Sequence, residues 1–211
     1  YNGDTNYNSA DSACEPLEVT QFRSEVQTQV HDPNHLDITN QSVPVGTPVH
    51  DLAIVIGGTG PVPTGLVTFD LFGDPLCQTG PIIPPEPVLL GGPPFGPGTA
   101  ESTPISLPVG SYGYLVSYSG DVAYLPSQGI CEPFRVEPLE SRVETQVHDA
   151  NHVDITNQSV PVGTVVHDKA TVIGNGVIVP TGLVSFDLYA DPNCSTQTII
   201  PIEILPLALL G

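Results

Sequence analysis

The sequence has no Met and no Trp, and its Lys and Arg residues number only 4, against 23 Asp and Glu. The formal net charge of −19 repels polyanions, so neither nucleic acid nor an anionic membrane surface is expected as a partner. No apolar run reaches the roughly 18 residues of a membrane-spanning helix, which predicts no membrane insertion. Because the first residue is Tyr1 and not Met, we expect a processed form or a segment of a longer chain.

Helical patterns are also missing. No window of about 12 residues that is free of Pro and Gly repeats its apolar positions every 3.6 residues. The chain instead contains 24 Pro and 21 Gly, which punctuate short runs rich in Val, Ile and Leu. Such a pattern is typical of many short strands joined by turns, so the sequence predicts an all-β protein.

A long internal repeat organises the chain. Shifting the sequence by 117 positions aligns residues 1–94 with 118–211 without a gap, and more than half of the aligned pairs are identical. The block VHDPNHLDITNQSVPVGTPVHD at 30–51 returns as VHDANHVDITNQSVPVGTVVHD at 147–168. A fixed offset over such a length is the signature of tandem structural repeats.

The phase of the repeat predicts three parts. Residues 1–20 carry the last strands of a preceding repeat, 21–137 form a complete repeat, and 138–211 hold the first two-thirds of a third. One interpretation is a window from a long array. The other is that subunits complete each other's broken domains head to tail, which would build a filament.

Strands are expected wherever apolar residues alternate between turn signals in the complete repeat. About seven short strands in roughly 100 residues predict an immunoglobulin-like β-sandwich, with Tyr112 or Tyr114 as a tyrosine-corner residue. The Pro-rich stretch 81–98 predicts a rigid surface loop with one short edge strand at Val88–Leu90. The expected strands are Glu25–His31, Leu36–Asn40, Val49–Ile56, Leu66–Phe72, Ser102–Leu107, Ser111–Tyr118 and Gly129–Val136.

Several segments carry a family resemblance. VPVGTPVHDLAIVIG, PVPTGLVTFDLF, LPVGSYGYLVSYSGDVAY and the closing CEPFRV resemble the bacterial immunoglobulin-like repeats of large extracellular surface and filament proteins. The resemblance covers essentially the whole chain. It implies tandem immunoglobulin-like β-sandwiches with adhesive, stalk or filament roles, and it implies no catalytic residues.

The predicted function is therefore structural. We expect a subunit or segment of an extracellular filament, stalk or pilus-like surface fibre, whose partners are copies of itself or adjacent repeats of the same chain. The alternative is a cell-adhesion module that binds a surface glycan or protein through its loops, with calcium or another metal at domain junctions. No nucleophile stands beside a base in a convincing pattern, so no enzymatic activity and no catalytic residue are expected.

The four cysteines form two repeat-equivalent pairs. Cys77 and Cys131 lie within one complete repeat and predict a disulfide, which would stabilise the fold by roughly 3–4 kcal/mol in the chain-entropy model. Cys14 and Cys194 are expected to pair beyond the chain or in a neighbouring subunit, and four free thiols are the alternative. The spacing lacks the CxxC pattern of thiolate zinc sites. Disulfides predict an oxidising compartment, outside the cell or at its surface.

All six histidines fall in the repeated block, and each copy adds three aspartates within 21 residues. Imidazoles with carboxylates suit a transition metal, and the carboxylates alone suit Ca²⁺ between domains. The alternative is structural, with the aspartates capping turn amides and the histidines beside them at the surface. No other cofactor is expected. The candidate metal ligands are His31, Asp32, His35, Asp37, His50 and Asp51, with their copies His148, Asp149, His152, Asp154, His167 and Asp168.

Three Asn-x-Ser triplets match the acceptor pattern for N-glycosylation. They begin at Asn40, Asn157 and Asn193, and the first two fall on expected surface turns. These three asparagines are candidate glycosylation sites.

Overall fold

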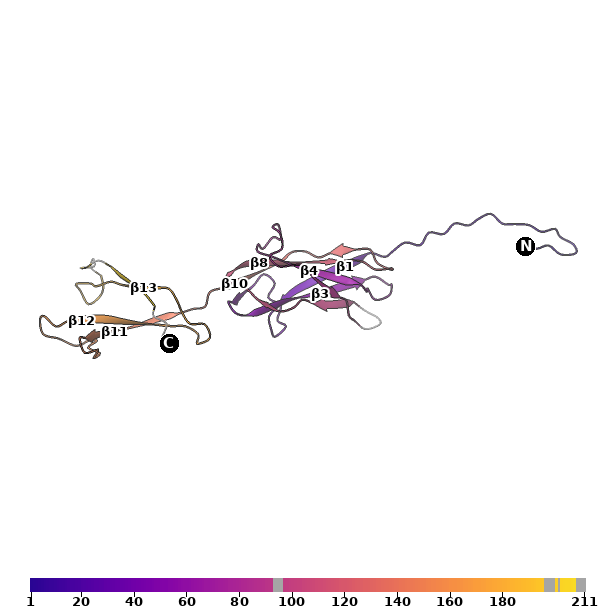
Figure 1. The fold of residues 1–211 in the computed structure, drawn as a ribbon. Helices are drawn as coiled ribbons and strands as arrows, with labels where there is room; N and C mark the ends of the chain where they lie inside the picture. Colours follow the sequence, from indigo (N-terminus) through magenta and orange to yellow (C-terminus); the bar gives the residue numbers. More distant parts are fainter. Residues whose placement is uncertain (93–96, 196–199, 201, 208–211) are drawn as a thin grey trace. The chain divides into compact units, whose positions relative to one another are not determined.

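The computed structural model describes all residues except 93–96, 196–199, 201 and 208–211. The described residues form strands, turns and loops, and no helix among them could cross a membrane. The chain divides into two compact units, Tyr1–Glu137 (unit 1) and Pro138–Gly211 (unit 2). This division falls where the sequence places the end of the complete repeat. Figure 1 shows the strands of both units.

Unit 1 contains a run of strands that begins after an N-terminal stretch without any, residues 1–21. The strands described in unit 1 are β1 (Ser24–His31), β2 (Ser42–Pro44), β3 (Pro48–Gly57), β4 (Leu66–Phe72), β5 (Glu86–Leu89), β6 (Gly98–Glu101), β7 (Ile105–Ser106), β8 (Gly110–Tyr118), β9 (Ser127–Gln128) and β10 (Glu132–Glu137). Those described in unit 2 are β11 (Arg142–Asp149), β12 (Val166–Ile173), β13 (Leu183–Phe186) and β14 (Glu203–Pro206).

The strands of unit 1 form two sheets. The first has the order β1-β3-β6, with β7 also paired to β3, and the second has the order β2-β10-β8-β4-β5, with β9 paired to β8. The pairs are antiparallel except β2 and β10, which run parallel. Both sheets thus join strands that are far apart in the sequence, so the sandwich forms only when the whole repeat is present.

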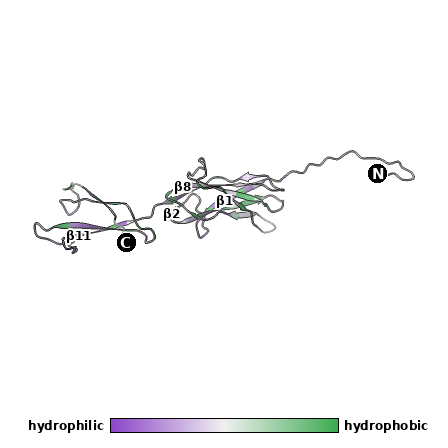
Figure 2. Cartoon of the chain, viewed as in Figure 1, coloured by the Kyte–Doolittle hydropathy of each residue, from purple (hydrophilic) through white to green (hydrophobic). Residues whose placement is uncertain are grey.

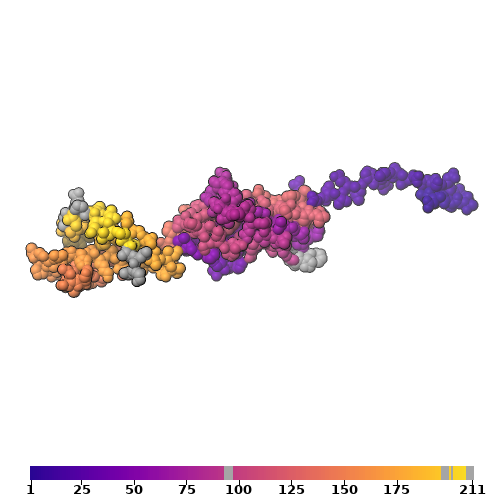
Figure 3. Space-filling view, viewed as in Figure 1, coloured from indigo at the N-terminus to yellow at the C-terminus, as the bar shows by residue number. Residues whose placement is uncertain are grey.

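Buried side chains from both sheets meet in two adjoining clusters, so the sheets face one another as a β-sandwich. Along β1 the buried residues Val26 and Val30 alternate with more exposed neighbours, as a half-buried strand requires. One cluster joins Val30 of β1 to Phe134 of β10, and the other joins Val26 to Val116 of β8. Figure 2 shows hydrophobic residues along these strands, and Figure 3 shows unit 1 from β1 to β10 as one closely packed body.

Several expectations about the strands are wrong. Strands β2 and β9 are not among the expected ones, and the expected strand Ser102–Leu107 contains only the short β7. Leu36–Asn40 is not a strand: Asp37 forms one isolated bridge with His31, and the chain then turns at Thr39 and Asn40. The Asp37 carboxylate accepts the Thr39 amide, and Asn40 adopts a left-handed φ of 61°. The apolar signal of this segment came from Ile38, which is buried in the core. Strand β6 was missed because it follows directly on the Pro-rich stretch. The sequence predicts a surface loop up to residue 98, whereas β6 begins at Gly98, and residues 93–96 of the stretch lie outside the described part.

The tyrosine corner is formed by Tyr112, whose hydroxyl donates a 2.9 Å hydrogen bond to the carbonyl oxygen of Pro108. The ring is buried and stacks on Phe134. We expect Tyr112→Phe to lower the free energy of unfolding by about 1 kcal/mol, because the hydrogen bond from this buried tyrosine to the Pro108 carbonyl oxygen is lost. Urea unfolding measures this, and the matched control is Tyr7→Phe, at a ring that is 71% exposed. Equal midpoints for the two variants would contradict the assignment.

Unit 2 repeats two strand pairs of unit 1 in the same register. The pairing of Val143 with Val172 in β11 and β12 reproduces that of Val26 with Val55, each shifted by 117. Likewise β13 and β14 pair as β4 and β5 do, with Leu183 opposite Pro206 as Leu66 is opposite Leu89. Sequence repetition is therefore matched by repetition of local structure.

The basic residues lie at the margins of the sandwich. Arg23 immediately precedes β1, and Arg135 lies in β10 with its side chain exposed. Arg142 and Lys169 belong to unit 2. The chain from β1 to the start of β10 therefore carries no Lys or Arg.

Candidate metal centre

The end of β1, its following turn and β3 bring three histidines together. His31 pairs directly with His50 across the two strands. The turn after His31 is closed by Asp32, whose carbonyl accepts the His35 amide at 3.0 Å and whose carboxylate accepts the Leu36 amide at 3.0 Å. The turn thus returns His35 to the end of the strand pair. We call His31, His35 and His50 the first histidine trio.

The rings of the first trio converge on one point. One ligating nitrogen of each lies within 4.8 Å of the others. The shortest separation is 3.3 Å, between Nε2 of His50 and Nδ1 of His35. The ring centroids are 5.0–5.9 Å apart and the rings meet edge to face, so the imidazoles do not stack.

Two members of the trio are withdrawn from solvent, His31 at 6% exposure and His50 at 4%. Burial lowers the pKa of His50, and the Glu101 carboxylate offsets this only in part. His31 places Nε2 3.4 Å from the Gln29 side-chain oxygen, while its buried Nδ1 has no hydrogen-bond partner among the described residues. Neutral imidazoles with a free nitrogen lone pair are what metal ions bind.

A second histidine trio, His148, His152 and His167, has the same construction in unit 2. His148 pairs with His167 across β11 and β12, and the ligating nitrogens of the three again lie within 4.8 Å. The centroid of the His167 ring is 5.6 Å from that of His148 and 4.9 Å from that of His152. Nδ1 of His148 is buried without a hydrogen-bond partner in the described part of the chain. In both units the three imidazoles therefore come from one strand pair and its turn.

The aspartates predicted as ligands have other partners. Asp32 and Asp37 cap amides of the turn, and Asp149 and Asp154 do the same in unit 2. These contacts match the structural alternative for the aspartates. The groups of converging ligand atoms contain neither Asp51 nor its exposed copy Asp168. The structure thus brings together the imidazoles of the predicted set and leaves its carboxylates elsewhere.

A carboxylate that the sequence did not suggest stands beside the first trio. Glu101 of β6 is paired with Leu52 of β3, and its Oε1 lies 3.9 Å from Nδ1 of His35. No local motif could have identified Glu101, because it follows the histidine block by some fifty residues and arrives through sheet pairing. It supplies an anionic oxygen where a fourth ligand could stand.

Two further acids, Asp51 and Glu132, meet between the sheets. Asp51 is fully buried, Glu132 is 5% exposed, and their carboxyls lie within hydrogen-bonding reach. No N–H or O–H of the described residues reaches an oxygen of Asp51 at normal geometry. Desolvation and then mutual repulsion raise the pKa of Asp51, and desolvation raises the pKa of Glu132 to about 7. Both carboxyls are therefore easier to protonate than exposed ones.

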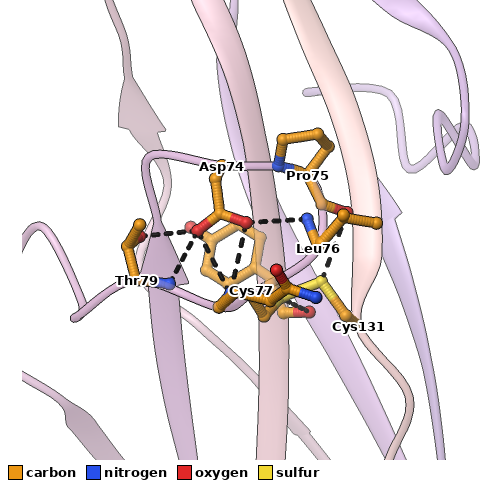
Figure 4. The surroundings of a disulfide bond; sticks show 8 residues. Asp74, Pro75, Leu76, Cys77, Thr79 and Cys131 are labelled. Carbon is orange, nitrogen blue, oxygen red and sulfur yellow. Dashed lines mark hydrogen bonds between the residues drawn. A yellow bond between two sulfur atoms is a disulfide. The ribbon is translucent and has the colours of Figure 1, made fainter.

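The predicted Cys77–Cys131 disulfide is present. Figure 4 shows it beside a turn in which the Asp74 carboxylate accepts the Leu76 amide and both the amide and the hydroxyl of Thr79. The hydrogen bonds from Thr79 stabilise the Asp74 carboxylate most, and they lower its pKa to about 2. The sulfurs pass over Gly113 of β8, where a Cβ would lie only 2.8–2.9 Å from them. A disulfide indicates an oxidising compartment.

The remaining predicted residues are exposed. Cys14 and Cys194 are free thiols on the surface, so their pairing beyond the chain stays a prediction. Asn40, Asn157 and Asn193 are also exposed, and the first two have left-handed backbones in turns. Their surroundings would admit a glycan.

Comparisons with protein-family models, with curated proteins and with solved structures find no match to this chain. The fold, the repeat and the sites described above are therefore the grounds on which a function can be proposed.

Proposed function

We propose that this chain is a segment of an extracellular tandem array of immunoglobulin-like β-sandwiches, with a structural role at the cell surface. The observation that carries the proposal is the recurrence of β1–β3 and β4–β5 as β11–β12 and β13–β14, each pair in the same register. A chain that rebuilds the same local structure every 117 residues is organised as a string of modules.

The strand order supports the immunoglobulin-like assignment. The sheet β1-β3-β6 corresponds to strands A, B and E, and β2-β10-β8-β4-β5 corresponds to A′, G, F, C and C′. The parallel pairing of β2 with β10 suits a first strand that switches sheets. The tyrosine corner lies at the start of β8, the strand equivalent to F, where such domains place it.

The chemistry of the module favours a load-bearing role over a ligand-binding one. The disulfide ties β10 to the loop after β4, and the Asp74 turn holds that loop through amide and hydroxyl bonds. Aromatic residues, which dominate recognition surfaces, make up 6% of the chain. The tyrosines at 112, 114, 118 and 124 are all buried in the sandwich.

Electron microscopy of the native surface material, labelled with an antibody against unit 1, tests the proposal. We expect label along filaments or stalks, repeated at intervals that are multiples of one domain length. Label confined to single globular particles, or to the interior of cells, would contradict it. An antibody against a scrambled peptide of equal charge is the control, because a strongly acidic antigen attracts basic proteins without specificity.

A further inference from the structure

We propose that each histidine trio binds one divalent transition-metal ion through three imidazoles, with Zn²⁺ as the ion of best fit, so that the chain holds two sites 117 residues apart. The proposal does not depend on the function proposed above, because the three imidazoles of each site come from one strand pair and its turn. The proposal gives a role to six histidines that are not part of the hydrophobic clusters of the sandwich.

The separation of the nitrogens fits a tetrahedral zinc site. With Zn–N bonds of about 2.0–2.1 Å, two ligands of a tetrahedron lie roughly 3.3–3.4 Å apart. Nε2 of His50 and Nδ1 of His35 are already 3.3 Å apart. The third ligating nitrogen lies within 4.8 Å, a distance that a small rotation of an imidazole closes. The backbone needs no rearrangement.

Without an ion, one buried imidazole nitrogen of the first trio, Nδ1 of His31, has no hydrogen-bond partner among the described residues. A bond between His50 and His35 satisfies one nitrogen of each ring. His31 then donates Nε2–H to Gln29, as metal-bound histidines donate their second nitrogen to an oxygen, and this leaves its Nδ1 lone pair buried and unmatched. Buried polar atoms in native proteins almost always have a partner. The same unmatched nitrogen recurs at His148.

The ligand set selects the class of ion. Imidazole nitrogen suits Zn²⁺, Cu²⁺ and Ni²⁺, whereas Ca²⁺ and Mg²⁺ need several oxygen ligands. The nearby aspartates are occupied with turn amides, so they do not supply such a cage. In unit 1 the Glu101 carboxylate, 3.9 Å from His35, is placed to take the fourth position. This gives three imidazoles and one carboxylate.

The backbone at His35 provides a matched variant. His35 and His152 have left-handed φ values of 57° and 61°, a region that Asn adopts more readily than most residues. His35→Asn and His152→Asn therefore keep the turns while each removes one imidazole. Both side chains are exposed, so the core stays intact.

Equilibrium dialysis of the full chain, freed of metal and then exposed to Zn²⁺, tests the proposal. We expect two tightly bound ions in the wild type, one in each single variant and none in the double variant. Ca²⁺ at equal concentration should not compete. At Zn²⁺ about 100-fold above Kd, the melting temperature of the wild type should rise by roughly 5–10 °C.

Controls separate the sites from the acidic surface. Glu15→Gln with Glu18→Gln removes two exposed carboxylates away from the trios and should leave both ions bound. In the wild type, Zn²⁺ should shift the NMR resonances of all six histidines, a readout that requires no variant to fold. Absence of stoichiometric binding, equal competition by Ca²⁺, or unchanged binding in the double Asn variant would each overturn the proposal.

The fourth ligand has its own test. Glu101→Gln should weaken Zn²⁺ binding in unit 1 by about tenfold or more and leave the unit 2 site unchanged. Unchanged affinity in unit 1 would remove Glu101 from the set of ligands.

Discussion

Replacing both Cys77 and Cys131 by Ser is expected to lower the free energy of unfolding of unit 1 by about 3–4 kcal/mol. The bridge closes a loop with a sequence separation of 54 residues, and in the chain-entropy model it stabilises the fold by restricting the unfolded chain. The loss is large against the roughly 5–15 kcal/mol that holds a typical domain together.

Tyrosine fluorescence during denaturant unfolding measures this loss. The chain has no Trp, and unit 1 buries four tyrosines, so the signal reports mainly on the sandwich. The matched control is Cys14→Ser with Cys194→Ser, which makes the same substitutions at exposed free thiols. If the two double variants unfolded at the same denaturant concentration, the bridge would contribute nothing to the sandwich.

The second large effect is a loss of stability as the pH rises, caused by the buried pair Asp51 and Glu132. Burial raises the pKa of Glu132 to about 7 in the folded chain, above its usual value in the unfolded one. A group with a raised pKa in the folded chain makes its full contribution to the free energy of unfolding at pH values below its pKa in the unfolded chain. That contribution is lost as the pH rises through its pKa in the folded chain. Stability should therefore fall between about pH 4.5 and 7, by roughly 2–3 kcal/mol.

Glu132→Gln isolates this contribution. The amide can donate to the Asp51 carboxylate, so the variant should be more stable than the wild type at pH 8 by roughly 2–3 kcal/mol and similar to it near pH 4.5. Urea unfolding across this range, in the presence of a chelator, measures the difference. Glu137→Gln, an exposed carboxyl on the same strand, should leave the pH profile of the wild type unchanged. Parallel profiles for wild type and Glu132→Gln would show that the pKa of Glu132 is not raised in the folded chain.

The sequence predicted those parts of the fold that local pattern controls. Strands such as β1, β4 and β8 alternate apolar residues between clear turn signals, and the disulfide followed from repeat arithmetic. Leu36–Asn40 was misassigned because a buried Ile38 in a turn imitates a strand when only hydropathy is considered. The sequence does not predict β6, because its pairing with β3 is a long-range contact that local hydropathy patterns do not reveal.

The residues of the candidate metal centre also fall into those that local sequence predicts and those that it does not. The sequence shows that the histidines lie within one block. The pairing of His31 with His50 across β1 and β3 then brings their rings together. Glu101 and Glu132 could not be found, because each meets its partners only after sheets formed from distant segments have assembled. Four of the predicted aspartates instead accept amides two to four residues later in their own turns, a local contact that competes with metal binding.

The position of the basic residues has a consequence for proteolysis. Trypsin-like enzymes cleave after Lys or Arg, and unit 1 offers them Arg23 just before β1 and Arg135 within β10. Every loop of the sandwich, including the Asp74 turn, lacks such a residue. An enzyme of this class can sever the approach to the sandwich and, after local unfolding, its last strand. Cleavage after Arg135 releases the chain from Val136 onward, while the Cys77–Cys131 bridge keeps the first part of β10 attached to the loop after β4. Such an enzyme therefore removes the end of one strand and leaves every loop of the sandwich uncut.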